Sequence, residues 1–453
     1  MGIVSNVFAG KTYAVLGLAR SGLATVETLA ASGARVVAWD NREEAREAAV
    51  DAVMEISTRT DGDVTLEIGD PMEIDLAGFD GVVVSPGVPL NRHPIAQRAK
   101  LAGVPVIGDI ELFALARPTL PPHKVVGITG TNGKSTTTAL IHHIIEQAGY
   151  PTRMGGNIGL PILGQEPLEP NLHGVGVYVL ELSSYQIDLT QSLDCDVAVL
   201  LNITPDHLDR YSGFEGYVAS KARLFAMQSA DHVAVIATED ASSRAIAQGA
   251  VGARVEVKAA DIDPVAQAGW PALQGPHNAQ NAAVAIAVAQ ALGIDEETTL
   301  NALASYASLP HRMQRVAERN GVLYVNDSKA TNPASTAPAL AAWPPVEGKP
   351  RIHWIVGGLA KSDNLDECLA QFGNVAHAYT IGEAGHMFAD LLRPHMAVDD
   401  SEMLSAAVRR AARIAQPGDV VLLSPACASF DQFRDFEARG DAFAAAVEAL
   451  GDV

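Results

Sequence analysis

Short apolar runs alternate with stretches of helical periodicity along nearly the whole chain. This alternation predicts strands joined by helices, and therefore an α/β fold with parallel sheets. At 453 residues the chain is too long for one ordinary core, so we expect two or three domains. Two breaks that contain proline, Arg117–His123 and Leu309–Pro310, divide the pattern. The predicted domains are residues 1–118, 119–309 and 310–453.

The most informative stretch is a glycine-rich turn between a predicted strand, Lys124–Gly127, and a predicted helix, Ser135–Gly149. Backbone N–H groups of such a turn and the positive end of the helix dipole bind phosphate oxygens. Lys134 adds a positive charge there, and the Ser135 hydroxyl can ligate Mg²⁺. The turn therefore predicts a site for a nucleoside triphosphate.

This turn departs from the commonest phosphate-loop pattern, G-x-x-x-x-G-K-[ST]. That pattern needs glycine where the chain has Ile128, and the glycines present, Gly130 and Gly133, form a tighter G-x-x-G-K-S loop. The alternative is a turn that only joins a strand to a helix. Gly-Lys-Ser at the helix start argues against that alternative, and the tighter loop indicates a subset of phosphate-loop enzymes.

Two further strand ends in the central segment carry acidic residues. One apolar strand ends in Glu181, which could hold Mg²⁺ or face solvent, and the residues alone favour neither. The next strand, Asp196–Leu201, leads into a loop with Asp206 and His207, followed by Asp209. These side chains could ligate a second hard cation or a substrate oxygen.

For a lysine and two asparagines of the central segment, position alone favours an ordinary structural role over a functional one. Lys221 lies on a predicted helix, Tyr217–Phe225, where a surface charge is the default. Asn278 and Asn281 precede an apolar helix, Ala282–Leu292, where an amide could cap the helix or read a purine edge. Capping is the default.

In the first segment, the turn Gly17–Gly22 opens a predicted helix and Asp40 follows the second strand. A dinucleotide fold with Asp40 on a ribose would fit this order, but the glycines do not match G-x-G-x-x-G. A nucleotide or nucleotide-sugar phosphate at the helix start stays open, whereas a hydride-transfer cofactor is not favoured. The turn Ser85–Pro89 follows a strand, where open α/β sheets bind ligands.

Three loops of the third segment each follow an apolar strand: Val325–Pro333, Ile355–Ser362 and Leu422–Phe433. Because parallel strands end at the same edge of a sheet, we expect these loops to converge. The cluster of cations and hydroxyls that results would suit a small carboxylated ligand. Its members are Lys329, Thr331, Lys361 and Ser429.

The net charge of −21 argues against nucleic acid or an anionic membrane surface as a partner. Three widely spaced cysteines, Cys195, Cys368 and Cys427, offer neither a disulfide framework nor a metal site. The start of the chain lacks the pattern of a secretory leader, and the longest apolar stretch is too short to cross a bilayer. We therefore expect a cytoplasmic enzyme that meets anionic substrates with locally placed cations.

Together these stretches resemble the Mur ligases, ATP-dependent amide-forming enzymes of peptidoglycan precursor synthesis. The stretches that carry the resemblance are Gly130–Thr136, Glu181–Ser184, Asn202–Tyr211, His277–Asn278 and His311–Arg312. Two more, Asn326–Asn332 and Ser424–Phe433, resemble the member that adds D-glutamate to UDP-N-acetylmuramoyl-L-alanine. The resemblance covers nearly the whole chain. It implies a Rossmann-like N-terminal domain for the UDP group, a central P-loop ATPase domain with a parallel sheet, and a Rossmann-like C-terminal domain that closes over the site.

The resemblance also implies roles for individual residues. The catalytic residues it implies are Lys134, Glu181, His207, Lys221 and Lys361. Those implied at ATP are Gly130, Thr131, Asn132, Gly133, Lys134, Ser135, Thr136, Asn278, Asn281, Arg312 and Asp327. Those implied at the UDP substrate are Leu18, Asp40, Arg42, Ser85, Pro86, Gly87, Asn157 and His207. Those implied at D-glutamate are Lys329, Thr331, Lys361, Ser429, Phe430 and Phe436. Those implied at two Mg²⁺ ions are Ser135, Glu181, His207 and Lys221, the last resembling a lysine carbamylated by CO₂.

The implied reaction begins with transfer of the γ-phosphoryl group of ATP to the substrate carboxylate, which forms an acyl phosphate that the amine of D-glutamate attacks. Cations would neutralise the repelling anions, and domain closure would exclude water. The implied partners are these small molecules, with no nucleic acid and no membrane insertion, and we expect a monomer.

Three alternative functions would use some of the same predicted sites. A sibling Mur ligase or a folylpolyglutamate-type ligase has the same central machinery and a different amino-acid substrate, but the motifs of the third segment argue against both. A nicotinamide-dependent oxidoreductase would use the first segment but leave the phosphate loop unexplained. A nucleotide sensor is the third rival, because a phosphate loop alone does not establish chemistry.

Overall fold

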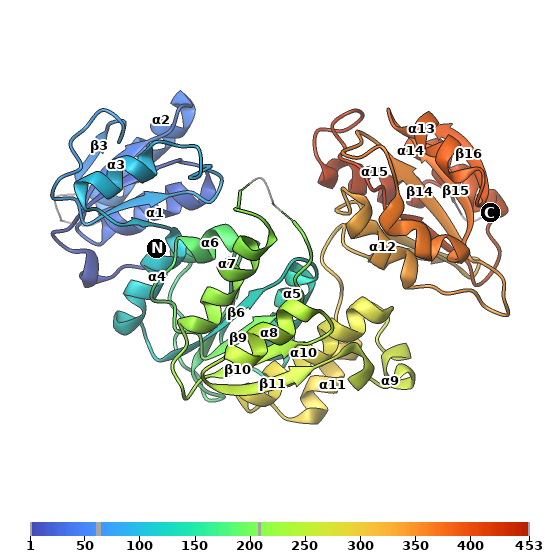
Figure 1. The fold of residues 1–453 in the computed structure, drawn as a ribbon, viewed down its shortest axis with the longest axis horizontal. Coiled ribbons are helices and arrows are strands. Elements are labelled where there is room, and N and C mark those ends of the chain that lie inside the picture. The colour runs from blue at the N-terminus through green and yellow to red at the C-terminus, as the bar shows by residue number, and fades with distance from the viewer. Residues whose placement is uncertain (1, 60–64, 207–209, 452–453) are drawn as a thin grey trace. The chain divides into compact units, whose positions relative to one another are not determined.

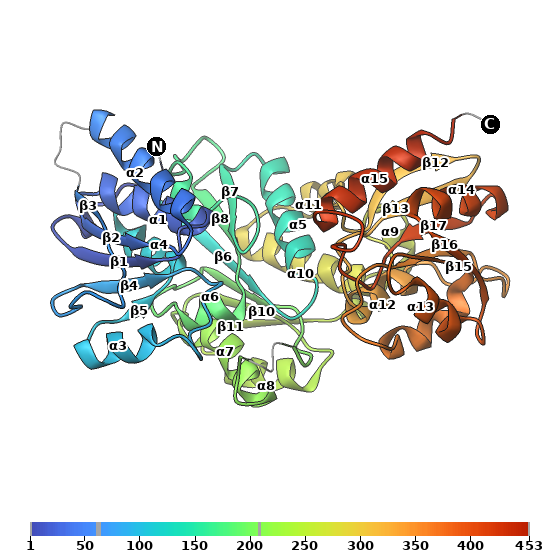
Figure 2. The same cartoon turned by 90° about the horizontal axis from the view of Figure 1, so that it is seen from above.

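The computed structural model describes residues 2–59, 65–206 and 210–451. The described chain packs as two compact units. The first comprises Met1–Lys258 and Val284–Leu300, and the second comprises Ala259–Ala283 and Asn301–Val453. Two sheets belong to the first unit and one to the second, and Figures 1 and 2 colour them in chain order from blue to red. Each sheet is covered by helices, so the predicted α/β class is confirmed.

The first sheet is parallel, in the order β3-β2-β1-β4-β5. Its central strand β1 is buried on both faces, with Tyr13 and Val15 in one apolar cluster and Ala14 and Leu16 in another. Because β1 lies between β2 and β4, the loops after these strands border one crevice. The strands are β1 (Thr12–Leu16), β2 (Arg35–Trp39), β3 (Thr65–Ile68), β4 (Gly81–Val84) and β5 (Val106–Ile107). The helices are η1 (Asn6–Phe8), α1 (Arg20–Ala31), α2 (Glu43–Arg59) and α3 (Ile95–Ala102).

The second sheet is also parallel, in the order β11-β10-β9-β6-β8-β7, so that β6 lies in its middle. The strands are β6 (His123–Thr129), β7 (Thr152–Gly156), β8 (Gly176–Glu181), β9 (Val197–Leu200), β10 (Val233–Ala237) and β11 (Ala253–Val257). The helices are α5 (Lys134–Gln147), η3 (Ile162–Gly164), α6 (Ser184–Asp188), α7 (Phe214–Ala226) and α8 (Ala241–Gly249). Burial of β6 and β8 on both faces explains why their sequences are continuous apolar runs.

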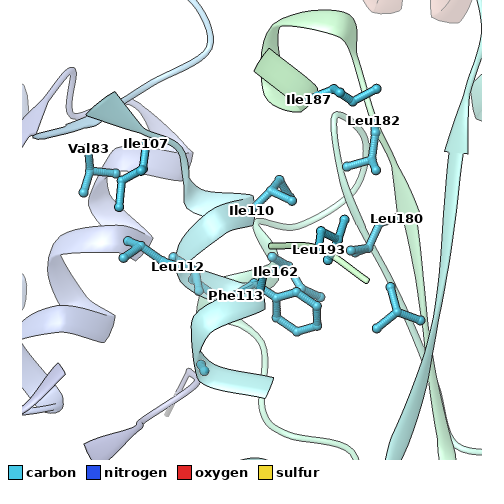
Figure 3. Packing of buried hydrophobic residues seen from close by; sticks show 14 of the residues in the cluster. Val83, Ile107, Ile110, Leu112, Phe113, Ile162, Leu180, Leu182, Ile187 and Leu193 are labelled. Carbon is cyan, nitrogen blue, oxygen red and sulfur yellow. The ribbon is translucent and has the colours of Figure 1, made fainter. Parts of the chain in front are cut away.

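One apolar helix, α4 (Asp109–Ala116), joins the cores of these two sheets. Figure 3 shows its side chains between those of the first sheet and those of the second. The Phe113 ring meets the Tyr178 ring edge-on, with centroids 5.0 Å apart. The helix is followed by η2 (Arg117–Thr119), which contains the start of the predicted proline-rich break. The first two sheets therefore share one continuous core.

The third sheet has the order β12-β13-β17-β14-β15-β16. Only the β12–β13 pair is antiparallel within it, because the two strands form a hairpin around Asn320 and Gly321, both with positive φ. An Asn-Gly pair between two apolar runs is a sequence signal for such a hairpin. The strands are β12 (Gln314–Arg319), β13 (Val322–Asn326), β14 (Ile352–Gly357), β15 (Val375–Ile381), β16 (Ala397–Glu402) and β17 (Val420–Leu423). The helices are α12 (Pro333–Ala341), η5 (Asp366–Asn374), α13 (Gly385–Leu392), α14 (Leu404–Ile414) and α15 (Phe436–Glu448).

The remaining helices lie between the second and third sheets in the sequence. They are η4 (Ala259–Asp261), α9 (Pro264–Ala268), α10 (Pro276–Leu292) and α11 (Glu296–Ser305). Helix α10 begins six residues before the apolar helix predicted from Ala282. None of the helices among the described residues is long and apolar enough to cross a membrane.

Candidate active site

The phosphate loop lies at the carboxyl end of β6, as predicted. Strand β6 continues two residues beyond the predicted strand, and α5 begins at Lys134. Gly133 precedes the helix with φ 87°, and Gly130 has φ 154°. A Cβ on Gly130 would lie 2.9 Å from the Leu201 Cβ, so the turn needs glycine for conformation and for space.

Asn202, two residues after the end of β9, holds this loop in place. Its backbone carbonyl accepts from the Thr131 N–H at 2.8 Å, and its Oδ1 accepts from the Asn132 N–H at 2.9 Å. The Lys134 Nζ folds back to donate to the Gly130 and Thr131 carbonyls, at 2.9 and 2.8 Å. The loop is therefore ordered by the protein itself. Ser135, in the first turn of α5, is buried, and Thr136 follows it.

Glu181 ends β8 beside this loop and is only 1% exposed, so the solvent-facing interpretation is wrong. Its Oε1 accepts from the Asn157 Nδ2 at 2.8 Å. Its Oε2 is buried without a hydrogen-bond partner among the described residues. A buried carboxylate oxygen without a donor is costly unless a cation compensates it, so Glu181 fits the predicted Mg²⁺ ligand.

Lys221 is 1% exposed on α7, so its interpretation as a surface charge is wrong. Its Nζ donates to the Gly130 carbonyl at 2.9 Å and lies 4.7 Å from the centre of the Tyr217 ring. Burial lowers the pKa of Lys221 well below its usual range, and the charge of Lys134 lowers it further. A lowered pKa favours the neutral amine, which is the form that reacts with CO₂.

His207, predicted to bind a second metal and the UDP substrate, lies outside the described residues, as does Asp209. The neighbouring Asp206 is described, and its charge opposes the lowering of the Lys221 pKa. Within the described ranges, no group of three or more His, Cys, Asp or Glu side chains is arranged to hold a metal ion.

The predicted UDP-binding residues of the first sheet lie in the loops that follow β1, β2 and β4. The Leu18 N–H donates to the Asp40 Oδ2 at 2.8 Å, and the Arg42 Nε donates to the Asp40 Oδ1 at 3.1 Å. These bonds, led by that of Arg42, lower the pKa of Asp40 to about 2. Ser85, which Pro86 and Gly87 follow, donates through its hydroxyl to the Gly17 carbonyl at 2.9 Å. Asn157 is instead at the second sheet, beside Glu181.

The three loops of the third sheet converge as predicted, because β13, β17 and β14 are adjacent and parallel. The Lys361 Nζ donates to the Thr331 Oγ1 at 3.3 Å, and the Lys329 Nζ lies 3.9 Å from the centre of the Phe436 ring. Ser429, in the loop after β17, is buried, whereas Phe430 is 69% exposed. The edge thus combines an exposed lysine, Lys361, and a half-buried one, Lys329, with a buried hydroxyl residue.

Asp327, directly after β13, connects two loops of this edge. Its Oδ1 accepts from the Met313 N–H at 3.2 Å and its Oδ2 from the Ser424 hydroxyl at 2.8 Å. Burial raises the pKa of Asp327 to about 7, although the nearby charge of Arg312 opposes the rise. The backbone next to Arg312 is therefore tied to the strand end.

Asn278 and Asn281 lie inside α10, so the default interpretation that they cap the apolar helix is wrong. The Asn281 Nδ2 donates to the Asn278 Oδ1 at 3.0 Å, and the Asn278 Nδ2 donates to the Gln274 carbonyl at 3.1 Å. Both are buried. The structure brings these two amides together on one side of the helix.

Sequence reasoning missed Arg439, a fully buried arginine on α15. Its Nη2 donates to the carbonyls of Ser328 and Cys427, at 2.8 and 3.0 Å, and its Nη1 donates to that of Ala428 at 3.2 Å. It thereby joins the loops after β13 and β17. No local signal marks it, because an arginine in a helix usually faces solvent.

Comparison with known proteins finds matches along most of the chain. The Mur ligase MurD-like N-terminal domain matches residues 11–108, the Mur ligase middle domain residues 128–272, and the Mur ligase glutamate ligase domain residues 311–427. The chain is 66% identical over 451 residues to the UDP-N-acetylmuramoylalanine–D-glutamate ligase of Novosphingobium aromaticivorans, with 99% of this chain and 97% of the relative covered.

The chain belongs to the Mur ligase family. A protein of the same name from Sphingopyxis alaskensis is 64% identical over 449 residues, covering 99% of this chain and 100% of that relative. The crystal structure of the UDP-N-acetylmuramate-alanine ligase MurC from Thermotoga maritima has a TM-score of 0.55 at 16% identity, covering 97% of this chain and 99% of that one. That likeness shows the shared fold.

Membership confirms the predicted enzyme class. A Mur ligase is an ATP-dependent, Mg²⁺-requiring ligase of small molecules, so the oxidoreductase and sensor alternatives are not favoured. The three-part Mur architecture predicted from the sequence is also confirmed. The roles of individual residues stay predictions.

Proposed function

We propose that this Mur ligase adds D-glutamate to UDP-N-acetylmuramoyl-L-alanine in cytoplasmic peptidoglycan precursor synthesis. The observation that carries the proposal is identity of 66% along 99% of the chain with a relative named for that reaction. The cluster of cations and hydroxyls at the third sheet supports it, because a dicarboxylic amino acid needs such partners. The alternative, a sibling ligase with a different amino-acid substrate, is not favoured by these relatives.

For the nucleotide-sugar substrate, we propose the crevice of the first sheet. Asp40 is ionised, and it can accept a hydrogen bond from the uridine while Arg42 and the Leu18 N–H hold it in place. In the turn from Ser85 to Gly87, the Gly87 N–H can donate to the diphosphate, because the Ser85 N–H donates to the Leu16 carbonyl and Pro86 has no N–H. Asn157, which lies beside Glu181 at the second sheet, is proposed to contact the part of this substrate nearer to the phosphate loop.

For phosphoryl transfer, we propose the loop from Gly130 to Thr136. A substrate carboxylate is a poor electrophile, so its oxygen attacks the γ-phosphorus, ADP leaves, and an acyl phosphate forms. Lys134 neutralises charge on the phosphates as the two anions approach. The amine of D-glutamate then attacks the acyl carbon, loses a proton and expels phosphate, which leaves the amide.

For the cations, we propose two Mg²⁺ ions. When bound, they would neutralise phosphate charge and polarise the reacting oxygens. The orphaned Glu181 Oε2 and the Ser135 hydroxyl suit the first ion. His207 and a carbamate on Lys221 are proposed for the second, because a carbamate turns a cation into an anionic oxygen ligand.

For the amino acid, we propose the edge of the third sheet. Lys361, Thr331 and Ser429 would hold the carboxylates of D-glutamate, and Lys329 would lie against Phe436 beside them. Phe430 is an exposed apolar residue of the loop that also contains Ser429.

For adenine and ribose, we propose the paired amides of α10 and two residues that follow this helix in the chain. The residues are Asn278, Asn281, Arg312 and Asp327.

We further propose that the enzyme is a cytoplasmic monomer with domains at residues 1–118, 119–309 and 310–453. The absence of any disulfide among the described residues, in which all three cysteines are free and buried, agrees with a reducing compartment. Sedimentation of the purified chain at assay concentration tests the oligomeric state.

The deciding experiment measures phosphate release with ATP, Mg²⁺ and UDP-N-acetylmuramoyl-L-alanine, adding D-glutamate, L-glutamate, L-alanine or meso-diaminopimelate in turn. We expect sustained turnover with D-glutamate alone. Turnover only with another amino acid would keep the ligase and refute the specificity. No turnover with any of them, despite ATP binding, would refute the proposed reaction.

The carbamate has its own test. We expect Lys221→Ala to lose activity and to regain part of it with bicarbonate or a short carboxylic acid, which can supply the missing oxygen ligand. The intact wild-type enzyme should carry the additional mass of CO₂ when measured without acid. Absence of both effects would remove the carbamate from the proposal.

A further inference from the structure

Three tyrosine rings form a continuous row beside the phosphate loop, all within the first unit. Tyr185 and Tyr211 are stacked with ring centroids 6.2 Å apart, and Tyr211 and Tyr217 are tilted with centroids 5.6 Å apart. A cation ends the row on each side. Lys221 lies over Tyr217, and the Arg210 Cζ lies 3.9 Å from the centre of the Tyr185 ring.

The two ends of the row have different surroundings. At the Lys221 end, the Tyr217 hydroxyl lies 3.2 Å from the Thr131 Oγ1 of the phosphate loop. At the other end, the Arg210 Nη2 donates to the Val88 carbonyl at 3.3 Å. The Val88 N–H in turn donates to the Ser85 carbonyl. Arg210 therefore connects the strand-end turn of the first sheet with α6 of the second.

The Arg210 guanidinium keeps most of its hydrogen-bonding capacity. A guanidinium has about five N–H donors, and the bond to Val88 is the single hydrogen bond of Arg210 within the described chain. No carboxylate among the described residues forms an ion pair with it. The contact of its Cζ with the Tyr185 ring limits the movement of the group, and a planar guanidinium can bind an oxyanion through two N–H groups.

We propose that Arg210 binds an oxyanion of the nucleotide-sugar substrate. The inference rests on the proposed function and deepens it, since none of the residues assigned to that substrate above is this arginine. The oxyanion is either the diphosphate, which would lie near the Ser85 turn, or the alanyl carboxylate, which must reach the phosphate loop. In a chain of net charge −21, a cation that forms no ion pair with a described carboxylate is well placed to attract either anion.

The test compares Arg210→Ala, Arg210→Lys and Arg210→Gln with the wild type. Glutamine keeps an N–H donor for the Val88 carbonyl but carries no charge, and lysine keeps the charge without the planar fork. For Ala and Gln we expect the KM and the calorimetric Kd of UDP-N-acetylmuramoyl-L-alanine to rise about 10- to 100-fold. The KM values of ATP and D-glutamate should stay within about twofold, and lysine should restore part of the affinity.

The matched control is Arg254→Ala, which removes a guanidinium that also donates to one carbonyl, that of Ala247 at 2.8 Å. Arg254 is exposed on β11 and pairs with Glu256. We expect no change in the Kd of the nucleotide sugar from this variant. Thermal unfolding of every variant checks that each one is folded.

Two ligands separate the sources of the oxyanion. If Arg210→Ala weakens UDP and the alaninamide form of the substrate as much as the acid, the partner is the diphosphate. If it weakens only the acid, the partner is the carboxylate. Both outcomes support the proposal.

Three outcomes would overturn it: unchanged affinity in all variants, full affinity in Arg210→Gln, or equal losses for all three cosubstrates. Full affinity in Arg210→Gln would mean that the arginine only holds the Val88 turn. Failure of the proposed function is distinguishable, because it would appear as wild-type enzyme that does not turn over. In that case, Arg210-dependent binding of the nucleotide sugar would still support this inference.

Discussion

The second and third sheets each present a cation at their carboxyl edge, but they hold it differently. Lys221, at the second sheet, is 1% exposed and donates to the phosphate loop. Lys361, at the third, is exposed, and its one hydrogen bond among the described residues, of 3.3 Å, is to Thr331. The first lysine belongs to a packed interior, and the second to the surface of the molecule.

This difference indicates a division of labour. A buried, ordered site costs no reorganisation when charge develops, so we expect its residues to affect kcat. An exposed cation keeps its hydration until a ligand arrives, so we expect its removal to affect the KM of that ligand. The predictions below test this division.

The largest effect is expected at Glu181. Glu181→Ala removes the buried carboxylate, and kcat should fall about 10²- to 10³-fold, because no other group replaces a cation ligand. The kcat of Glu181→Gln should fall nearly as far, although the glutamine keeps a hydrogen-bond partner for Asn157. Steady-state phosphate release measures both, with Glu146→Ala on the exposed side of α5 as the control. A fall in kcat of less than tenfold would contradict the assignment of the rate effect to the buried site.

At the third sheet, Lys361→Ala should raise the KM of D-glutamate about 10- to 100-fold, because one charge-assisted bond to a carboxylate is lost. The KM of ATP should stay within about twofold. The control is the exposed Lys349→Ala. If kcat fell instead and the KM of D-glutamate did not change, Lys361 would act like the buried residues of the second sheet, which we expect to affect kcat.

Asp327 predicts a pH dependence of stability, because burial raises its pKa to about 7. The folded state therefore binds a proton that the unfolded state releases near its lower pKa. This stabilisation is complete below the unfolded pKa and is lost as the pH rises toward 7. Between pH 5.5 and 8 the free energy of unfolding should fall by about 2 kcal/mol more in the wild type than in Asp327→Asn.

Urea unfolding at the two pH values measures this difference. Asp435→Asn is the control, because the pKa of that partly exposed helix cap is lowered rather than raised. Equal pH dependence in the wild type and in Asp327→Asn would show that Asp327 is ionised in the folded state throughout.

The smallest effect is expected for Asn202→Ala, which removes the side-chain bonds that hold the Asn132 backbone. The Thr131 bond to the Asn202 carbonyl would remain. The KM of ATP should therefore rise only about three- to tenfold, with little change for D-glutamate. Exposed Asn301→Ala serves as the control. A change confined to D-glutamate would contradict the assignment of this loop to ATP.

The sequence by itself determined the alternation of strands and helices and the position of the phosphate loop. Both are local properties. Apolar periodicity reports the faces that an element buries, and Gly130, Gly133 and Lys134 lie within a few positions of one another. The convergence of the third-sheet loops could be predicted for a similar reason, because parallel strands end at a common edge.

Only the tertiary structure decided which polar residues are buried against these elements. Lys221 contacts a glycine 91 positions away, Asn202 a loop 70 positions away, and Arg439 a serine 111 positions away. Arg210 reaches Val88 across 122 positions. No local pattern separates such residues from surface charges, because their surroundings come from distant segments that meet only when the sheets have packed.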